Sequence, residues 1–398
     1  MKNSYIETSD WSKCTGCGEC LMKCPVMGLD EKTAKEEIHR LLKGEPTKHV
    51  LQECTLCYRC DDYCPIEGLY LYDLITERIS EKHPEKIPFF FAYILNGQPI
   101  NLWKDLYSDM FEERPKTRGI IDKWSEIPDK SEDVLWVGCV GRTICDSIDS
   151  SKVMAELPKY GPLDLCCGEL QYRLGKWKAY TDIIKKTAEQ LKKLKCERLV
   201  TYCGSCNYFL GHVYPKVSGE KLPFETISIY QWLYEKAKAG EIEVVNPINL
   251  KAAIQESCYI SATNQKLDKG MYYKLKELYE MAGMEVEDLP HHGDYGLSCG
   301  LASTMRDLRP TEFLKQARRK YKEVEEVGMK DLMVNCPGCF MMFGLTSFLP
   351  GIKVHYAVDH LLKAFGDDVD KPLNGFMNGF VKHLVPGLPF IYNPTEIV

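Results

Sequence analysis

Two cysteine runs near the start of the chain restrict its fold more than any other feature. The first run consists of Cys14, Cys17, Cys20 and Cys24, and the second of Cys54, Cys57, Cys60 and Cys64. Both have the spacing C-x2-C-x2-C-x3-C, and a proline follows each directly. Three such closely spaced thiolates cover one face of a metal cluster, so we expect the N-terminal part of the chain to fold around bound metal.

This spacing is the ligand pattern of bacterial ferredoxins with two [4Fe–4S] cubanes, in which the fourth cysteine of each run binds the other cluster. We therefore predict one cubane on Cys14, Cys17, Cys20 and Cys64, and a second on Cys54, Cys57, Cys60 and Cys24. Zinc also accepts four thiolates, but zinc sites rarely need two four-cysteine runs that each end at proline.

The other cysteines and the charge limit where such a chain can work. Nineteen cysteines occur in 398 residues, and no apolar signal segment follows Met1, so we expect reduced, metal-bound thiolates in the cytoplasm. The longest apolar stretch, residues 87–95, is shorter than the roughly twenty residues that span a bilayer, so a membrane would be reached only through a partner. A net charge of −6 disfavours nucleic acid as a partner.

The chain is predicted to have five parts. Residues 1–80 form the ferredoxin-like, α-rich domain, with helices at 36–43 and 69–79. The remaining parts are a helical connector at 81–130, a first α/β half at 131–245, a second half at 246–370, and a C-terminal arm at 371–398. The arm either packs on the chain itself or faces a partner.

The two halves repeat one order of elements. The first half has predicted strands at 134–137 and 198–202 with a helix at 181–195 between them. The second has strands at 252–255 and 332–335 around a helix at 266–282, and matched segments, 224–233 and 352–362, follow the last strands. Alternating strands and helices predict an α/β fold with parallel sheets, here as two pseudo-equivalent halves around an approximate two-fold axis.

Each half also carries its own cysteines in the same order. Half one has Cys139, Cys166, Cys167, Cys203 and Cys206, and half two has Cys258, Cys299, Cys336 and Cys339. The separations 203 − 167 = 36 and 336 − 299 = 37 nearly agree. Most of these cysteines follow a strand directly, where open α/β sheets place ligands and where helix N-termini favour anionic thiolate clusters.

The doubled Cys…Cys-Cys-Gly…Cys-x-x-Cys pattern resembles the cysteine-rich CCG domain of the heterodisulfide reductase catalytic subunit family. With the two-cubane domain in front, the chain is similar to the HdrD type over about residues 8–80 and 133–365. The resemblance implies one noncubane [4Fe–4S] cluster on the five half-one cysteines, and a disulfide cleaved between two such clusters. Cys145 is a reserve candidate for the position of Cys139.

Half two departs from the pattern because Ser298 stands where the double cysteine begins. Three outcomes stay open: a cluster with the Ser298 oxygen or an open iron site, a cubane or zinc on the four cysteines, or a metal-free structural half. An open iron site would suit substrate binding.

Four histidines and one cysteine outside the predicted ligand sets also have simple structural interpretations. His291 and His292 are candidates for a proton donor or a replacement ligand, although loop histidines without a chemical role are the simpler interpretation. We expect structural roles for His355 and His360 and a buried apolar thiol at Cys196.

Two functions are compatible with these motifs. As an oxidoreductase, the chain would take electrons from a flavoprotein of the HdrA type or from a cytochrome or membrane subunit. It would pass them through the two cubanes to the noncubane cluster, which reduces a small disulfide or related sulfur substrate. The alternative is a non-catalytic electron-transfer subunit of a flavin dehydrogenase or a membrane quinone-linked complex. A third hypothesis is a zinc-stapled scaffold. No G-x-G-x-x-G follows a strand, so we expect no tightly bound flavin or nicotinamide.

Overall fold

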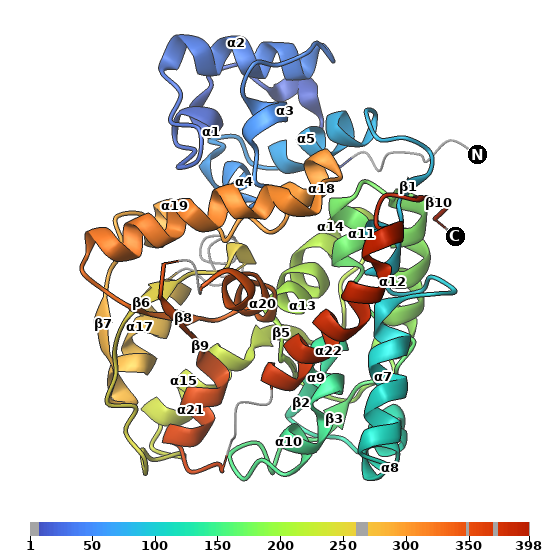
Figure 1. Ribbon diagram of the computed structural model, residues 1–398, viewed down its shortest axis with the longest axis vertical. Helices are drawn as coiled ribbons and strands as arrows, with labels where there is room; N and C mark the ends of the chain where they lie inside the picture. The colour runs from blue at the N-terminus through green and yellow to red at the C-terminus, as the bar shows by residue number, and fades with distance from the viewer. Residues whose placement is uncertain (1–7, 260–269, 348–349, 369–372, 398) are drawn as a thin grey trace.

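The N-terminal part of the chain lies across one end of two α/β halves (Figure 1). The computed structural model describes residues 8–259, 270–347, 350–368 and 373–397. None of the helices in these ranges has the length and apolar character needed to cross a membrane.

The N-terminal unit is helical, as expected for a ferredoxin-like domain. After the 3₁₀ turn η1 (Trp11–Lys13), it contains α1 (Glu19–Met22), α2 (Glu31–Leu42), α3 (Val50–Glu53), α4 (Arg59–Tyr63) and α5 (Leu71–Ser80). The helix predicted at 36–43 begins earlier, because the Asp30 carboxylate caps it by accepting a hydrogen bond from the Thr33 amide at 2.9 Å. The helix predicted at 69–79 is α5.

The connector is joined to the C-terminal arm. The connector consists of β1 (Ile87–Pro88), α6 (Phe89–Tyr93), α7 (Leu102–Glu113) and α8 (Lys116–Ser125); the arm consists of α22 (Leu373–Gly387), η5 (Leu388–Phe390) and β10 (Pro394–Thr395). Strands β1 and β10 pair antiparallel, and the Trp103 ring of α7 stacks on Phe376 of α22 at 6.1 Å between centroids. The described part of the arm therefore packs on the chain itself.

Half one is a four-stranded parallel sheet in the order β3-β2-β4-β5. Its elements are β2 (Asp133–Trp136), α9 (Gly138–Thr143), α10 (Cys145–Asp149), β3 (Lys159–Tyr160), α11 (Glu169–Arg173), α12 (Trp177–Leu191), β4 (Arg198–Thr201), α13 (Gly204–Tyr208), the π-helix η2 (Phe209–Val213), α14 (Tyr214–Ser218), β5 (Glu225–Ser228) and α15 (Ile229–Lys238). The two central strands, β2 and β4, are almost wholly buried, as is typical of a parallel sheet with helices on both faces.

Half two repeats that topology in the order β7-β6-β8-β9, again all parallel. Its elements are β6 (Lys251–Gln255), α17 (Met271–Met281), β7 (Glu285–Glu287), η3 (Gly293–Tyr295), α18 (Ser303–Asp307), η4 (Pro310–Glu312), α19 (Phe313–Glu326), β8 (Asp331–Val334), α20 (Pro337–Thr346), β9 (Lys353–Tyr356) and α21 (Ala357–Ala364). Residues 266–269 of the predicted helix lie outside the described residues. The α/β fold with two repeated parallel-sheet halves is confirmed.

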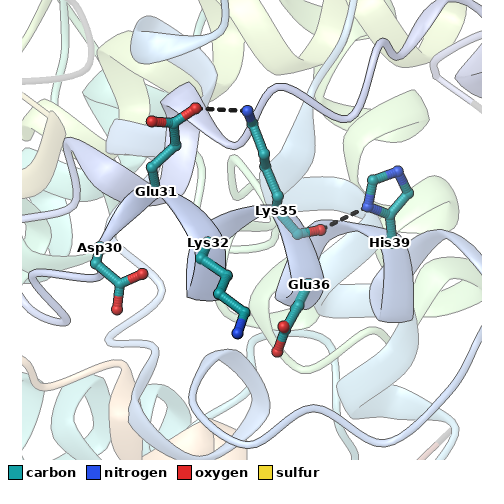
Figure 2. A pocket seen from close by; sticks show the side chains of 6 residues that line it. All are labelled: Asp30, Glu31, Lys32, Lys35, Glu36 and His39. Atoms are coloured by element: carbon teal, nitrogen blue, oxygen red, sulfur yellow. Dashed lines mark hydrogen bonds and ion pairs between the residues drawn. The ribbon is translucent and has the colours of Figure 1, made fainter.

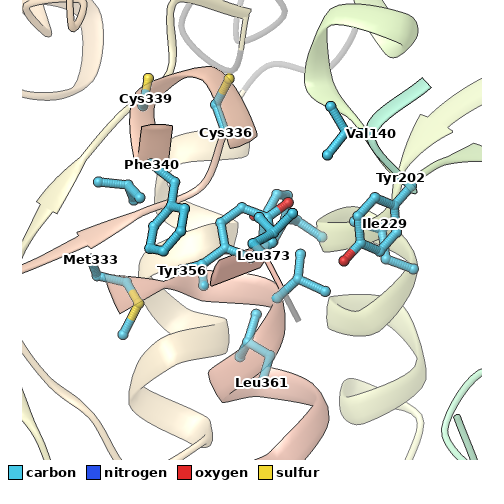
Figure 3. Packing of buried hydrophobic residues seen from close by; sticks show 14 of the residues in the cluster. Val140, Tyr202, Ile229, Met333, Cys336, Cys339, Phe340, Tyr356, Leu361 and Leu373 are labelled. Atoms are coloured by element: carbon cyan, nitrogen blue, oxygen red, sulfur yellow. The ribbon is translucent and has the colours of Figure 1, made fainter. Parts of the chain in front are cut away.

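The two halves share one hydrophobic core. Figure 3 shows Tyr202 and Ile229 of half one facing Tyr356 and Leu361 of half two. Hydrogen bonds cross the same interface: the Tyr230 hydroxyl donates to the Asn335 carbonyl at 3.0 Å. The halves are therefore packed against each other as one body.

Candidate iron–sulfur centres

The fold groups the eight N-terminal cysteines into two sets that cross the two runs. Cys20 lies near Cys64, Cys17 and Cys14, and burial together with these neighbours raises the pKa of its thiol. In the second set, Cys54 lies near Cys57 and Cys24. Cys60 lies near Cys54 and Cys57, and also near Cys20 of the first set. These are the two predicted sets; that each holds a cubane stays a prediction.

The two cysteine loops share an unusual backbone shape. Gly16 and Gly18 have φ of 70° and 77°, and the matching residues of the second loop, Leu56 and Tyr58, have 54° and 67°. The left-handed region costs a residue with a Cβ roughly 1–2 kcal/mol, so packing must hold Leu56 and Tyr58, both fully buried. The loop directs the Leu56 amide to the Cys54 sulfur at 3.3 Å, a contact that stabilises a thiolate.

Burial also affects the protonation of these thiols and therefore how the sites would bind iron. It raises the pKa of Cys24 to about 11 and that of Cys54 to about 12. At neutral pH such thiols keep their protons in the absence of metal, and binding iron must displace them.

Half one brings its five predicted cysteines together. Cys139 follows β2, Cys203 caps α13 after β4, and Cys206 lies inside α13. Their sulfurs form a chain of contacts in the order Cys139, Cys166, Cys167, Cys206, Cys203. Hydrogen bonds from Cys139 and Cys167 hold the pKa of Cys166 well below its usual range.

Two amide groups add to the Cys166 environment. The Gly168 amide lies 3.4 Å and the Asn96 side-chain amide 3.5 Å from the Cys166 sulfur. At Gly138, with φ +67°, a Cβ would lie 3.2 Å from the Cys206 sulfur, so a glycine permits this approach. No sequence pattern singles out Asn96, which comes from the connector.

Half two gathers its four cysteines in the same way. Cys336 caps α20 and Cys339 lies within it; the Cys339 thiol contacts those of Cys299 and Cys336. Cys258 lies near Cys299 and Cys336. Ser298 turns to the N-terminal unit, where its hydroxyl donates to the Thr55 hydroxyl at 3.2 Å.

The fold places the reserve residues elsewhere. Cys145 is buried against Met110, with 3.8 Å between the sulfurs, and burial raises its pKa to about 12. Cys196 is half-buried. His291 pairs with the Glu323 carboxylate, and His292 Nδ1 lies 2.7 Å from the Leu289 carbonyl.

His355 of the edge strand β9 and His360 of α21 form a pair. His355 lies 2.7 Å from Asp331 and 3.2 Å from His360. These contacts fit the structural roles expected for both.

Two of the buried arginines, Arg142 and Arg173, lie beside the cysteines of the halves and were not predicted from the sequence. Arg142 donates to the carbonyls of Gly161 and Leu165 beside the half-one cysteines, at 3.0 and 2.8 Å. Arg173 donates to the Cys258 sulfur at 3.2 Å. Arginine is rarely buried without partners, and these partners lie 19, 23 and 85 residues away in the chain, so no local pattern indicates them.

A surface hollow of about 580 Å³ lies along α2 of the N-terminal unit (Figure 2). Polar and charged side chains line it; Lys35 Nζ lies 2.5 Å from Glu31, and His39 Nδ1 lies 2.7 Å from the Lys35 backbone carbonyl. We interpret it as a solvated helix face.

The donor chemistry fits iron–sulfur clusters. Every member of the four groups is a thiol, a soft ligand that suits iron–sulfur clusters and zinc. Within the described ranges, no three histidine, cysteine or acidic side chains surround one point as ligands of a single ion would. The fit therefore rests on donor type and grouping.

Comparison with known proteins divides the chain at the same places. Residues 10–67 match the family described as a 4Fe-4S dicluster domain, and residues 134–211 and 252–344 each match the cysteine-rich CCG domain.

Three relatives illustrate the range of similar proteins. The EtfAB:quinone oxidoreductase of Syntrophomonas wolfei is 21% identical over 82% of this chain, which spans 47% of that protein. The HdrD-type subunit of the dihydromethanophenazine:CoB–CoM heterodisulfide reductase of Methanosarcina barkeri is 22% identical over 84% of this chain and 88% of its own length. A subunit of the fumarate reductase (CoM/CoB) of Methanothermobacter marburgensis is 19% identical over 92% of this chain and 74% of its own length.

Proposed function

We propose that this chain, an iron–sulfur oxidoreductase subunit of the CCG family, reduces a disulfide or a related sulfur substrate. The electrons would come from a redox partner, either a flavoprotein of the HdrA type or a cytochrome or membrane subunit. Reduction takes two electrons and two protons and converts R–S–S–R into two R–SH.

The convergence of the five half-one thiols carries the proposal. Cys139, Cys166, Cys167, Cys203 and Cys206 come from two strand ends and one loop, yet their sulfurs are in contact. They would hold the noncubane cluster, which supplies the electrons to the sulfur substrate when bound, while the two N-terminal sets would hold cubanes that carry single electrons.

The chain's own groups prepare the site for negative charge. The Gly168 amide and the Asn96 side chain both donate toward the Cys166 sulfur, which favours its thiolate form. Helix α12 and the connector exclude water from this side, because Tyr180 of α12 and Cys166 are buried.

A substrate would enter at the interface between the two halves. Cys139, Cys203 and Cys258 are half-buried, whereas Cys167, Cys206 and Cys339 are buried. Cys203 of half one lies near Cys336 of half two, and a Cβ on Gly204 would lie 3.6 Å from Tyr259 Cβ. The more exposed of these cysteine residues thus come from both halves, on the two sides of one interface.

Iron and sulfide analysis of anaerobically purified protein tests the cluster count. About eight iron atoms per chain would mean cubanes only, and about twelve or sixteen would include the halves. A Cys167→Ser variant should lose the half-one electron paramagnetic resonance (EPR) signal and disulfide reduction, whereas Cys145→Ser, outside the group, should keep both. Disulfide reduction and an unchanged signal in Cys167→Ser would refute the proposal.

Ser298 favours a second candidate function, electron transfer without a substrate of its own. Half two therefore has one thiol fewer than half one. In place of a thiol, the Ser298 hydroxyl donates a hydrogen bond to Thr55 in the loop between Cys54 and Cys57, which we call the cubane loop. A wild-type chain that passes electrons between partners but reduces no disulfide would support this candidate. A Ser298→Cys variant that raises iron per chain would show that half two accepts a cluster.

A further inference from the structure

Each half has one buried arginine beside its cysteines. Arg142 is 0% exposed and Arg173 is 2% exposed. Both belong to the half-one sequence, but Arg173, at the end of α11, reaches over to Cys258 of half two. The buried arginine that contacts a half-two cysteine sulfur therefore comes from the other half.

The Arg173 guanidinium joins three parts of the chain. It donates to the Cys258 sulfur at 3.2 Å and to the Leu56 carbonyl, which lies between Cys54 and Cys57 of the predicted cubane. It also forms an ion pair with Glu169 at 2.7 Å and a hydrogen bond with the Tyr259 hydroxyl at 2.8 Å. One side chain thus contacts both the cubane loop and the half-two site.

Aromatic rings enclose this cation. Tyr58 follows Cys57, Tyr208 follows Cys206 by two residues, and Tyr259 follows Cys258. Their ring centroids form a triangle with sides of 4.8, 5.8 and 5.9 Å, and Arg173 Cζ lies 5.2 Å from the Tyr58 centroid and 4.9 Å from that of Tyr259. Rings in place of water keep the local dielectric low and strengthen the charge's effect.

We propose that Arg173 is a positioning residue that holds the loop between Cys54 and Cys57 against the half-two site and raises the midpoint potential of a cluster bound there. This inference rests on the proposed function. A fixed positive charge against Cys258 stabilises the electron that half two gains, and Glu169 offsets part of that charge.

Further contacts join the same N-terminal loop to half two. Thr55 accepts a hydrogen bond from Ser298, and Arg306 of α18 donates to the Cys54 carbonyl at 2.9 Å. The loop between Cys54 and Cys57 therefore touches the half-two site at several points. A purely structural ion pair would have the same geometry, so the test needs a readout that charge alone moves.

The experiment is an anaerobic redox titration of the full chain followed by EPR. The half-two signal is identified by its loss in Cys339→Ser. We expect Arg173→Met to lower its midpoint potential and Glu169→Gln to raise it, with the half-one signal unchanged in both. Arg142→Met, the matched control, should lower the half-one midpoint and leave half two unchanged.

A purely structural role of the Arg173–Glu169 ion pair does not predict midpoint shifts of opposite sign in Arg173→Met and Glu169→Gln. Equal shifts of all signals, or shifts of one sign in Arg173→Met and Glu169→Gln, would overturn the proposal. If the Arg173→Met variant does not bind iron, the Glu169→Gln variant alone still tests the proposal. Glu169 is 20% exposed, and glutamine has nearly the same shape, so the packing is kept. A wild-type chain without a half-two signal also overturns it, whereas loss of disulfide reduction in Cys167→Ser would still support the proposed function.

Discussion

The glycine of the first Cys-Cys-Gly motif offers the sharpest test of how the fold shapes a cysteine site. Gly168 has φ +76°, and a Cβ there would lie 2.7 Å from Tyr180 Cδ2 and 3.1 Å from Ile183 Cγ2. Both neighbours belong to α12, which covers the half-one cysteines, and Tyr180 is fully buried. Gly168→Ala therefore adds a methyl group where neither backbone nor packing accepts one.

The expected cost is the sum of two terms. A left-handed backbone costs alanine roughly 1–2 kcal/mol relative to glycine. Forcing a methyl group into a packed core costs about 1–3 kcal/mol more, because Tyr180 must shift. We expect Gly168→Ala to lower the free energy of unfolding by about 2–5 kcal/mol in total. Since Cys167 adjoins the strained residue, the half-one EPR signal should weaken as well.

Guanidinium unfolding under anaerobic conditions, followed by tryptophan fluorescence, measures this change. The matched control is Gly119→Ala in α8, where nothing lies within 4 Å of the added Cβ. That substitution should raise stability by about 0.5–1 kcal/mol, because alanine favours a helix. Equal midpoints in the two variants, with the half-one signal intact in Gly168→Ala, would refute the role assigned to this backbone shape.

Three further predictions test other parts of the molecule. Cys64→Ser should remove the EPR signal of the cubane set containing Cys20 and spare the other set, and Cys24→Ser should do the reverse; loss confined to the mutated run would contradict the crossed grouping. Asp73→Asn should cost about 3–5 kcal/mol in denaturation, because it breaks a buried ion pair with Lys216 at 2.8 Å, whereas Asp182→Asn in an exposed pair should cost under about 1 kcal/mol. Burial lowers the pKa of His83 below its ordinary 6.5, so the unfolded chain takes up the proton more readily. Stability should be full above about pH 6.5 and fall as the pH drops, and His83→Gln should flatten that fall; an unchanged pH profile would contradict it.

The sequence could predict those parts of the fold that depend on local residue patterns. Continuous apolar runs located the central strands β2, β4, β6 and β8, and cysteine spacing located the two runs and both halves. The edge strands Lys159–Tyr160 and Glu285–Glu287 were missed because two or three residues carry too little periodicity. Helix boundaries shifted by a few residues where a cap or a turn decided them.

Long-range partners explain the remaining gap. Asn96 lies 70 residues from Cys166, and Arg173 lies 85 residues from Cys258. Neither residue belongs to a motif, and each acquires its place only when distant segments fold together. Ser298 was visible as a departure, but its contact with Thr55, 243 residues away, was not.

Buried ion pairs hold the N-terminal unit to both halves, so the predicted boundary at residue 80 is not a free hinge. Arg59 of the N-terminal unit and Glu256 of half two form an ion pair at 3.8 Å with both side chains buried, and Asp73 pairs with Lys216 of half one. Separating the parts would leave these charges without their partners, which costs several kcal/mol for each buried pair. The cubane loop is therefore held at one fixed position against both halves. In the proposed function, electrons would therefore pass to the halves across fixed contacts such as those of Arg173 and Ser298, without movement of the N-terminal unit.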